Sequence, residues 1–82
     1  MTKVFHLTIA KVGENLFDGE AVSATVPGAE GVLTVLANHE TFVTPLKQGT
    51  IHVESADGTK QEFQLTESGI LEVSNNQATV IL

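Results

Sequence analysis

Hydrophobic and polar residues alternate over short stretches of this chain, which is the pattern of β-strands that bury one face. The first such stretch places Phe5, Leu7 and Ile9 on one side of a strand. A second extended run, residues 16–26, contains Asp18-Gly19, where we expect a turn or bulge to divide it in two. No window repeats apolar residues at helical spacing behind a capping residue, so the pattern predicts no helix.

Residues 26–39 form the stretch around which we expect the other strands to be organised, and they read as strand, turn, strand, turn. Proline cannot donate a hydrogen bond to a sheet, so the strand before Pro27 should end at Val26. The run 32–36 is short, apolar and rich in β-branched residues, which favours a buried strand. A short strand after this stretch contains Pro45 and is expected at the edge or end of a sheet.

Three turns contain residues that tolerate left-handed backbone conformations. Gly28 and Gly31 supply positive φ for the central turn. Asp57-Gly58 lies between two alternating runs, which is a strong hairpin signal, and Asn75-Asn76 suits the two-residue turn of a second hairpin. About eight short strands predict an all-β fold, a two-sheet sandwich or flattened barrel, in which residues 1–82 form a single domain.

Composition narrows the class of partner. Four lysines, no arginine and ten acidic residues give a net charge of −6, which repels phosphate backbones and anionic lipid. The phenylalanines lie in apolar strand patterns without basic neighbours, so we assign them to core packing and expect no nucleic-acid partner. No stretch approaches the run of about 18 apolar residues that spans a bilayer. We therefore expect a soluble intracellular protein without direct membrane insertion.

Catalytic and metal-binding motifs are weak. The three histidines, His6, His39 and His52, lack ligand spacing, so we expect no metal site. Ser68 could join His39 and an acid in a nucleophilic triad, but the sequence has no nucleophile elbow. The glycine-containing central turn lacks the ending of a phosphate loop. We therefore predict no catalytic residue and no cofactor, and favour a binding or structural module over an enzyme.

The central region carries more apolar residues than one face of a sheet requires. Val32, Leu36, Phe42 and Val43 make up this surplus. Either part of it lies at an interface with another protein, or all four side chains pack inward; the pattern alone leaves both readings open.

The order and spacing of several short motifs resemble the N-terminal β-sandwich domain of the epsilon subunit of rotary ATP synthases. The resemblance spans essentially the whole chain, and no single motif carries it. The matching residues are Phe5-His6-Leu7, Leu16-Phe17-Asp18-Gly19, Val26, Gly28, Glu30, Gly31, His39, Lys47, Gly49 and Ser68-Gly69-Ile70-Leu71-Glu72-Val73.

This resemblance implies a non-catalytic rotor subunit in the central stalk of a proton-transporting ATP synthase. In the family, the sandwich links the gamma subunit to the polar loops of the membrane c-ring and so couples proton flow to ATP synthesis. The implied location is peripheral, on the cytoplasmic face of the membrane as part of the complex. Family members commonly continue into a helical hairpin, which would begin where this sequence stops, and we expect the chain as given not to bind ATP.

The resemblance also implies site residues. Lys11, His39 and Thr44 correspond to the gamma-facing surface of the family, and Glu30, Gly31 and Val32 to the loop that meets the c-ring. Val32 departs from the acid often found at its position, which removes a possible charged contact with the c-ring. Before His39, Ala37-Asn38 stands in place of Pro-Gly, and Asn38 retains the ability to adopt positive φ. The alternative reading is an unrelated small β-sandwich that binds a protein or a sugar.

Overall fold

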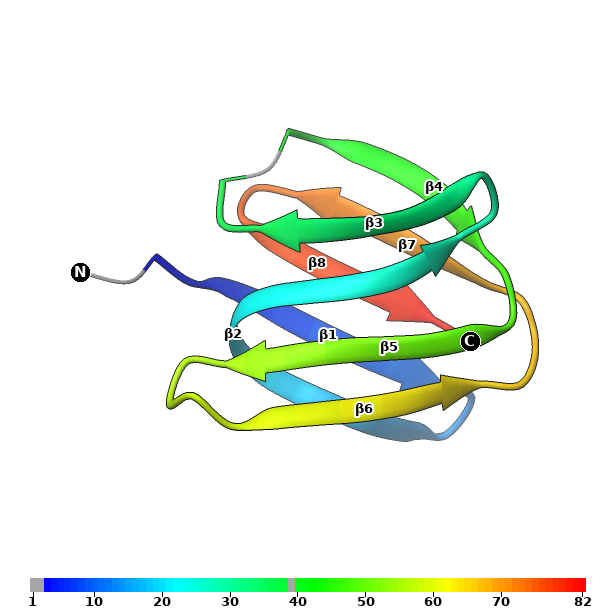
Figure 1. Ribbon diagram of the computed structural model, residues 1–82, viewed down its shortest axis with the longest axis horizontal. Helices are drawn as coiled ribbons and strands as arrows, with labels where there is room; N and C mark the ends of the chain where they lie inside the picture. The colour runs from blue at the N-terminus through cyan, green and yellow to red at the C-terminus, as the bar shows by residue number, and fades with distance from the viewer. Residues whose placement is uncertain (1–2, 39) are drawn as a thin grey trace.

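The structure, a computed structural model, describes residues 3–38 and 40–82, and all of its regular elements are strands. Within those residues no helix forms, as the absence of helical periodicity predicted. Figure 1 shows the eight strands wrapped into two layers. In chain order they are β1 (Phe5–Lys11), β2 (Glu14–Gly28), β3 (Gly31–Leu36), β4 (Phe42–Leu46), β5 (Gly49–Ser55), β6 (Lys60–Leu65), β7 (Gly69–Ser74) and β8 (Gln77–Ile81).

The long strand β2 belongs to both layers. Its first half pairs with β1, which continues the back layer through β8 and β7 to β4. Its second half pairs with β3 on one side and with β5 and then β6 on the other, forming the front layer. The layers meet again at Gly28, which pairs with both Gly31 and Leu46. This arrangement confirms the predicted two-sheet sandwich or flattened barrel.

The predicted break in the second extended run is wrong, because β2 is continuous over 15 residues. Asp18 and Gly19 pair in register with Thr8 and Leu7 of β1. The irregularities lie instead at Leu16, which has no partner between two paired residues, and at Val22, where the pairing with β5 shifts. Bulges increase the local twist of a strand, and the one at Val22 lies where β2 passes from one layer to the other.

The prediction that β2 ends at Val26 is also wrong, because the strand continues through Pro27 to Gly28. The carbonyl of Pro27 accepts a hydrogen bond from the Lys47 amide at 2.9 Å. The N–H and C=O of one residue in an antiparallel strand point toward the same neighbour, so an N–H at position 27 would also point away from β3. The proline therefore costs the β2–β3 ladder no hydrogen bond.

The core lies between the layers and is apolar. Phe5, Leu7 and Ile9 are buried, as the alternation in the first stretch predicted, and the other phenylalanines pack partly buried against the core. Phe17 and Phe63 meet edge to face with ring centroids 6.0 Å apart, which joins β2 to β6. The other buried apolar residues are Ala21, Ala24, Val26, Val35, Leu46, Ile51, Val53, Leu65, Leu71, Val73, Ala78 and Val80.

Strand β3 is not the buried strand that its apolar run predicted. Val35 is buried, whereas Val32 and Leu36 leave 72% and 53% of their surface exposed. The reason is that the front layer covers the core with one face only, so alternate side chains of β3, its outer strand, point to solvent. Burial of both faces requires a second layer that these residues do not have.

Both predicted hairpin turns are confirmed. Gly58 has φ 91° in the connection between β5 and β6, and the Asp57 carboxylate accepts a hydrogen bond from the Thr59 amide at 2.9 Å. Asn75 and Asn76 have φ 51° and 59° between β7 and β8, the left-handed pair that a tight two-residue hairpin needs.

The Asp57 turn predicts a pH dependence of stability. The Thr59 amide holds the pKa of this carboxyl below its ordinary value, and the Thr59 side chain acts in the same direction. The ionised group therefore contributes stability above the unfolded pKa of about 3.9, and this contribution is lost as the pH falls through the lower folded pKa. Melting temperatures between about pH 5 and pH 2 should fall less steeply for Asp57→Asn than for the wild type; parallel curves would contradict this account.

Candidate interface groove

A groove runs between β3 and β4, the two strands whose outer edges are largely unpaired. The two strands lie closest together at Gly28 of β2, which pairs with Gly31 at the start of β3 and with Leu46 at the end of β4. From there they diverge across the top of the molecule (Figure 1). The groove has a volume of about 470 Å³ and is lined by Gly28, Glu30, Gly31, Val32, Leu33, Phe42, Val43 and Thr44.

Apolar side chains stand open to solvent along this groove. Val32 and Val43 are 72% and 62% exposed, one on each wall, and Leu36 lies further along β3. Phe42 is half-buried and packs against the core. The structure therefore rules out the reading in which all four surplus apolar residues pack inward. Apolar side chains that solvent reaches on two facing strand edges are typical of a surface that a partner covers.

The structure brings four of the six predicted site residues together. Glu30, Gly31 and Val32, assigned by resemblance to the c-ring contact, line the same groove as Thr44, assigned to the gamma contact. Gly31 has φ 139°, in the region that favours glycine, directly after the exposed turn residue Glu30. The Thr44 hydroxyl donates to the carbonyl of Pro45 at 3.4 Å.

The other two predicted residues do not join this group. Lys11 ends β1 and forms an ion pair with Glu14, with 3.5 Å between its Nζ and the carboxylate oxygen. β1 is separated from β4 by β8 and β7, so three strand spacings, about 14 Å, lie between Lys11's strand and Thr44's. His39 lies outside the described residues. Asn38, which precedes it, has φ 61°, so the expectation that this asparagine adopts positive φ is confirmed.

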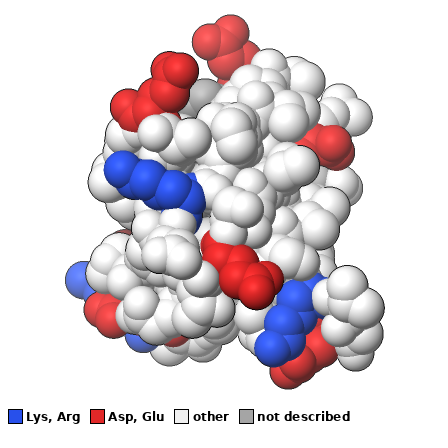
Figure 2. Space-filling view, turned by 90° about the vertical axis from the view of Figure 1, so that its right-hand side faces the viewer, with Lys and Arg blue, Asp and Glu red and all other residues white. Residues whose placement is uncertain are grey.

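Charge does not dominate the end of the sandwich where the β2–β3 turn lies. Figure 2 looks onto that end and shows acidic and basic side chains interspersed over a largely uncharged surface, with no large cluster of one sign. Such a surface suits a protein partner recognised by shape and apolar contact better than a polyanion.

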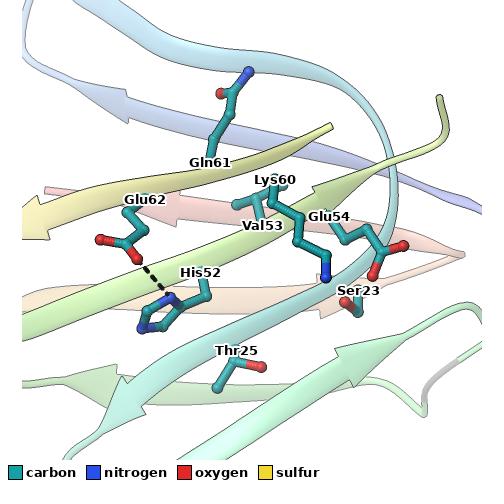
Figure 3. A pocket seen from close by; sticks show the side chains of 8 residues that line it. All are labelled: Ser23, Thr25, His52, Val53, Glu54, Lys60, Gln61 and Glu62. Carbon is teal, nitrogen blue, oxygen red and sulfur yellow. Dashed lines mark ion pairs between the residues drawn. The ribbon is translucent and has the colours of Figure 1, made fainter. Parts of the chain in front are cut away.

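A second, polar hollow lies on the outer face of the front layer. Ser23 and Thr25 of β2, His52 of β5 and Glu62 of β6 lie across neighbouring strands there (Figure 3). The His52 Nδ1 is 3.5 Å from a Glu62 oxygen, and both side chains are more than half exposed. This exposed arrangement lacks the desolvation that activates a catalytic base. His6 pairs with Asp18 at 2.6 Å in the other layer, and among the described residues no group of three or more metal-ligating side chains gathers.

The groove was only partly predictable. The apolar surplus was visible in the sequence, but Leu33 was not singled out, and nothing local indicated that β3 would face β4 across a groove.

The described part of the chain contains no helix with the length and apolar character needed to cross a membrane.

Comparison with known proteins identifies the family. Residues 4–82 match the ATP synthase delta/epsilon chain beta-sandwich domain. The chain is 37% identical over 76 residues to the ATP synthase epsilon chain of Delftia acidovorans, and the aligned region covers 93% of this chain and 54% of that protein. It is 35% identical over 81 residues to the ATP synthase epsilon chain of Campylobacter hominis, covering 99% of this chain and 62% of that one. The chain thus spans little more than half the length of these curated relatives.

Solved structures share the fold. A chain of the Euglena gracilis mitochondrial ATP synthase, from a structure of its OSCP, F1 and c-ring, superposes with a TM-score of 0.86 at 24% identity, covering 99% of this chain and 51% of that one. A chain from the central stalk and c-ring of the Tetrahymena thermophila mitochondrial ATP synthase gives 0.74 at 16% identity, covering 93% and 60%. Together with the sequence match over nearly every residue, these findings confirm the resemblance, and the chain belongs to the ATP synthase delta/epsilon family through its β-sandwich domain.

Proposed function

We propose that this chain acts as a non-catalytic central-stalk domain that links the gamma subunit to the c-ring of a rotary, proton-transporting ATP synthase. In this role it transmits torque, and so couples proton flow to ATP synthesis. The support is its family, its similarity to proteins named ATP synthase epsilon chain, and a fold shared with chains from ATP synthase assemblies that include the c-ring. Its place in the cell would be peripheral to the membrane, on the cytoplasmic face, through the complex.

The β3–β4 groove is the observation that carries the proposal. The gamma subunit would cover Val43 and Thr44 on the β4 wall. Val43 is an exposed apolar side chain, and the centre of a typical protein interface is apolar and loses its water on binding. The polar loops of the c-ring would meet the β2–β3 turn, where the Glu30 carboxylate is the exposed charged group. The two contacts would adjoin, because the residues assigned to them line the same groove.

Lys11 and His39 keep the roles that the resemblance gives them, with different physical support. Lys11 lies at the same end of the sandwich as the β2–β3 turn but on the far side of the back layer, so a gamma subunit that reaches it must extend across that end. Its ion pair with Glu14 is exposed and would contribute little to binding on its own. His39 rests on the resemblance alone.

Gel filtration with purified partners tests the proposal. The chain, mixed with the gamma subunit of the same ATP synthase at about 10 μM, should elute as a one-to-one complex, since a standard interface reaches micromolar affinity or better. Addition of detergent-solubilised c-ring should shift the complex again. Separate elution of chain and gamma subunit at this concentration would refute the proposed role and favour an unrelated binding module.

A further inference from the structure

We propose that Asn76 is a positioning residue that sets the geometry of the β3–β4 groove from the opposite end of the molecule. Its side chain makes hydrogen bonds to two segments that are distant in sequence. Oδ1 accepts from the Asn38 amide at 2.7 Å, and Nδ2 donates to the Val4 carbonyl at 2.9 Å. The Asn76 carbonyl also accepts from the His6 amide at 3.2 Å.

These contacts join the two layers at the far end of β3 from Gly28, beyond the residues that line the groove. The groove is closed at Gly28, where one residue pairs with both walls, and the walls diverge from that point. At the other end, β3 finishes at Leu36 and Asn38 follows it. The Asn76 side chain fixes the backbone of Asn38, and thereby the end of the β3 wall.

The same residue is connected to the β4 wall. β4 pairs with β7 along its whole length, beginning with Phe42 opposite Val73. β7 ends at Ser74 and leads directly into the turn that holds Asn76. The Asn76 side chain therefore connects the end of β3 to the β7–β8 turn, and β7 is the strand that pairs with β4. The distance between the two walls of the groove thus depends on this side chain. A single hydrogen-bonded side chain of this kind would not be needed for the turn itself.

The turn can be kept while the side chain is removed. Asn76 has φ 59°, and Asn-Gly is the preferred sequence for a two-residue turn with two left-handed residues. The variant Asn76→Gly should therefore retain the hairpin and the fold while it loses both side-chain hydrogen bonds, with a melting temperature lowered by roughly 5–15 °C. The matched control is Asn75→Gly, which changes the neighbouring turn residue and leaves those two hydrogen bonds in place.

Two measurements test the inference, of which the first rests on the proposed function. Affinity for the gamma subunit should fall about tenfold in Asn76→Gly and stay at the wild-type value in Asn75→Gly, because a β3 wall that is no longer held in place must be ordered when the partner binds. An unchanged affinity in Asn76→Gly, with a wild-type chain that does bind, would overturn the inference while the proposed function stands.

The second measurement uses the free chain and is independent of any partner. Amide exchange at Asn38 should accelerate at least about tenfold in Asn76→Gly, because the amide loses its acceptor. NMR amide resonances of groove residues on β3 and β4 should move as well. Changes confined to the β7–β8 turn would refute the positioning role, even if the wild-type chain failed to bind the gamma subunit.

Discussion

Replacing Gly28 with alanine should destabilise the fold by about 3 kcal/mol, a large part of the stability of a domain this small. Gly28 does not have positive φ, so the strain first expected there is not the reason. A Cβ at position 28 would lie 2.6 Å from the backbone oxygen of Gly31 and 3.1 Å from Leu33 Cδ2. The oxygen belongs to the tight turn that pairs these two glycines, and it cannot move without opening the β2–β3 hairpin.

Thermal unfolding measures this effect. A loss of about 3 kcal/mol should lower the melting temperature by roughly 12–24 °C in a chain of this length. Gly19→Ala is the matched control within the same strand, because a Cβ there meets only the Phe17 ring at 3.8 Å. Gly31→Ala should destabilise the fold by an intermediate amount, about 1–2 kcal/mol, because φ at Gly31 is 139° but an added Cβ would meet no neighbouring atom. Equal melting temperatures for the Gly28 and Gly19 variants would show that the turn yields.

Local chemistry explains which parts of the fold the sequence could predict. The Asp57-Gly58 and Asn75-Asn76 turns were predictable because their conformation depends on residues that tolerate positive φ, whatever the strands pack against. The alternation of Phe5, Leu7 and Ile9 likewise identified a strand that buries one face, because the alternation follows from the two-residue period of the strand itself. In each case the physical cause lies within about ten residues of the pattern that reports it.

The errors concern features that depend on distant partners. Asp18-Gly19 looks like a break until β1 pairs with it, and the Pro27 position is compatible with a strand only because its carbonyl faces Lys47. The apolar composition of β3 was the same whether the strand lay in the middle of a sheet or at its edge, so burial could not be read from it. Sequence pattern gives the faces of a strand, and topology decides what covers each face.

The candidate site divides in the same way. Exposed apolar residues were recognisable as a surplus, and the resemblance supplied Thr44 and the residues 30–32 as separate contacts. Their union in one groove follows from the junction at Gly28, which pairs strands far apart in the chain. The Asn76 contacts link positions 38 and 72 residues apart, and a turn asparagine carries no local sign of such contacts.

Introducing a charge on the β4 wall should have the largest effect on partner binding. Val43→Asp places a carboxylate where we propose that the gamma subunit excludes water, and a buried charge without a partner costs several kcal/mol. Affinity for the gamma subunit should fall at least about 30-fold, equivalent to about 2 kcal/mol. Val43 is 62% exposed in the free chain, so the fold should tolerate the change, at a cost of up to about 1 kcal/mol because the new carboxylate lies opposite Glu72 of β7.

Ile81→Asp provides the matched control for this change. Ile81 is 56% exposed, close to the value for Val43, and it lies on β8, two strands away from β4 in the back layer. Both variants add one negative charge to a chain of net charge −6, so any general electrostatic repulsion of the gamma subunit affects them alike. Titration calorimetry should give near-wild-type affinity for Ile81→Asp only. If both variants bind the gamma subunit as tightly as the wild type does, the groove is not the gamma-facing surface. An equal loss of affinity in both variants would indicate repulsion by charge or an interface that extends across the back layer.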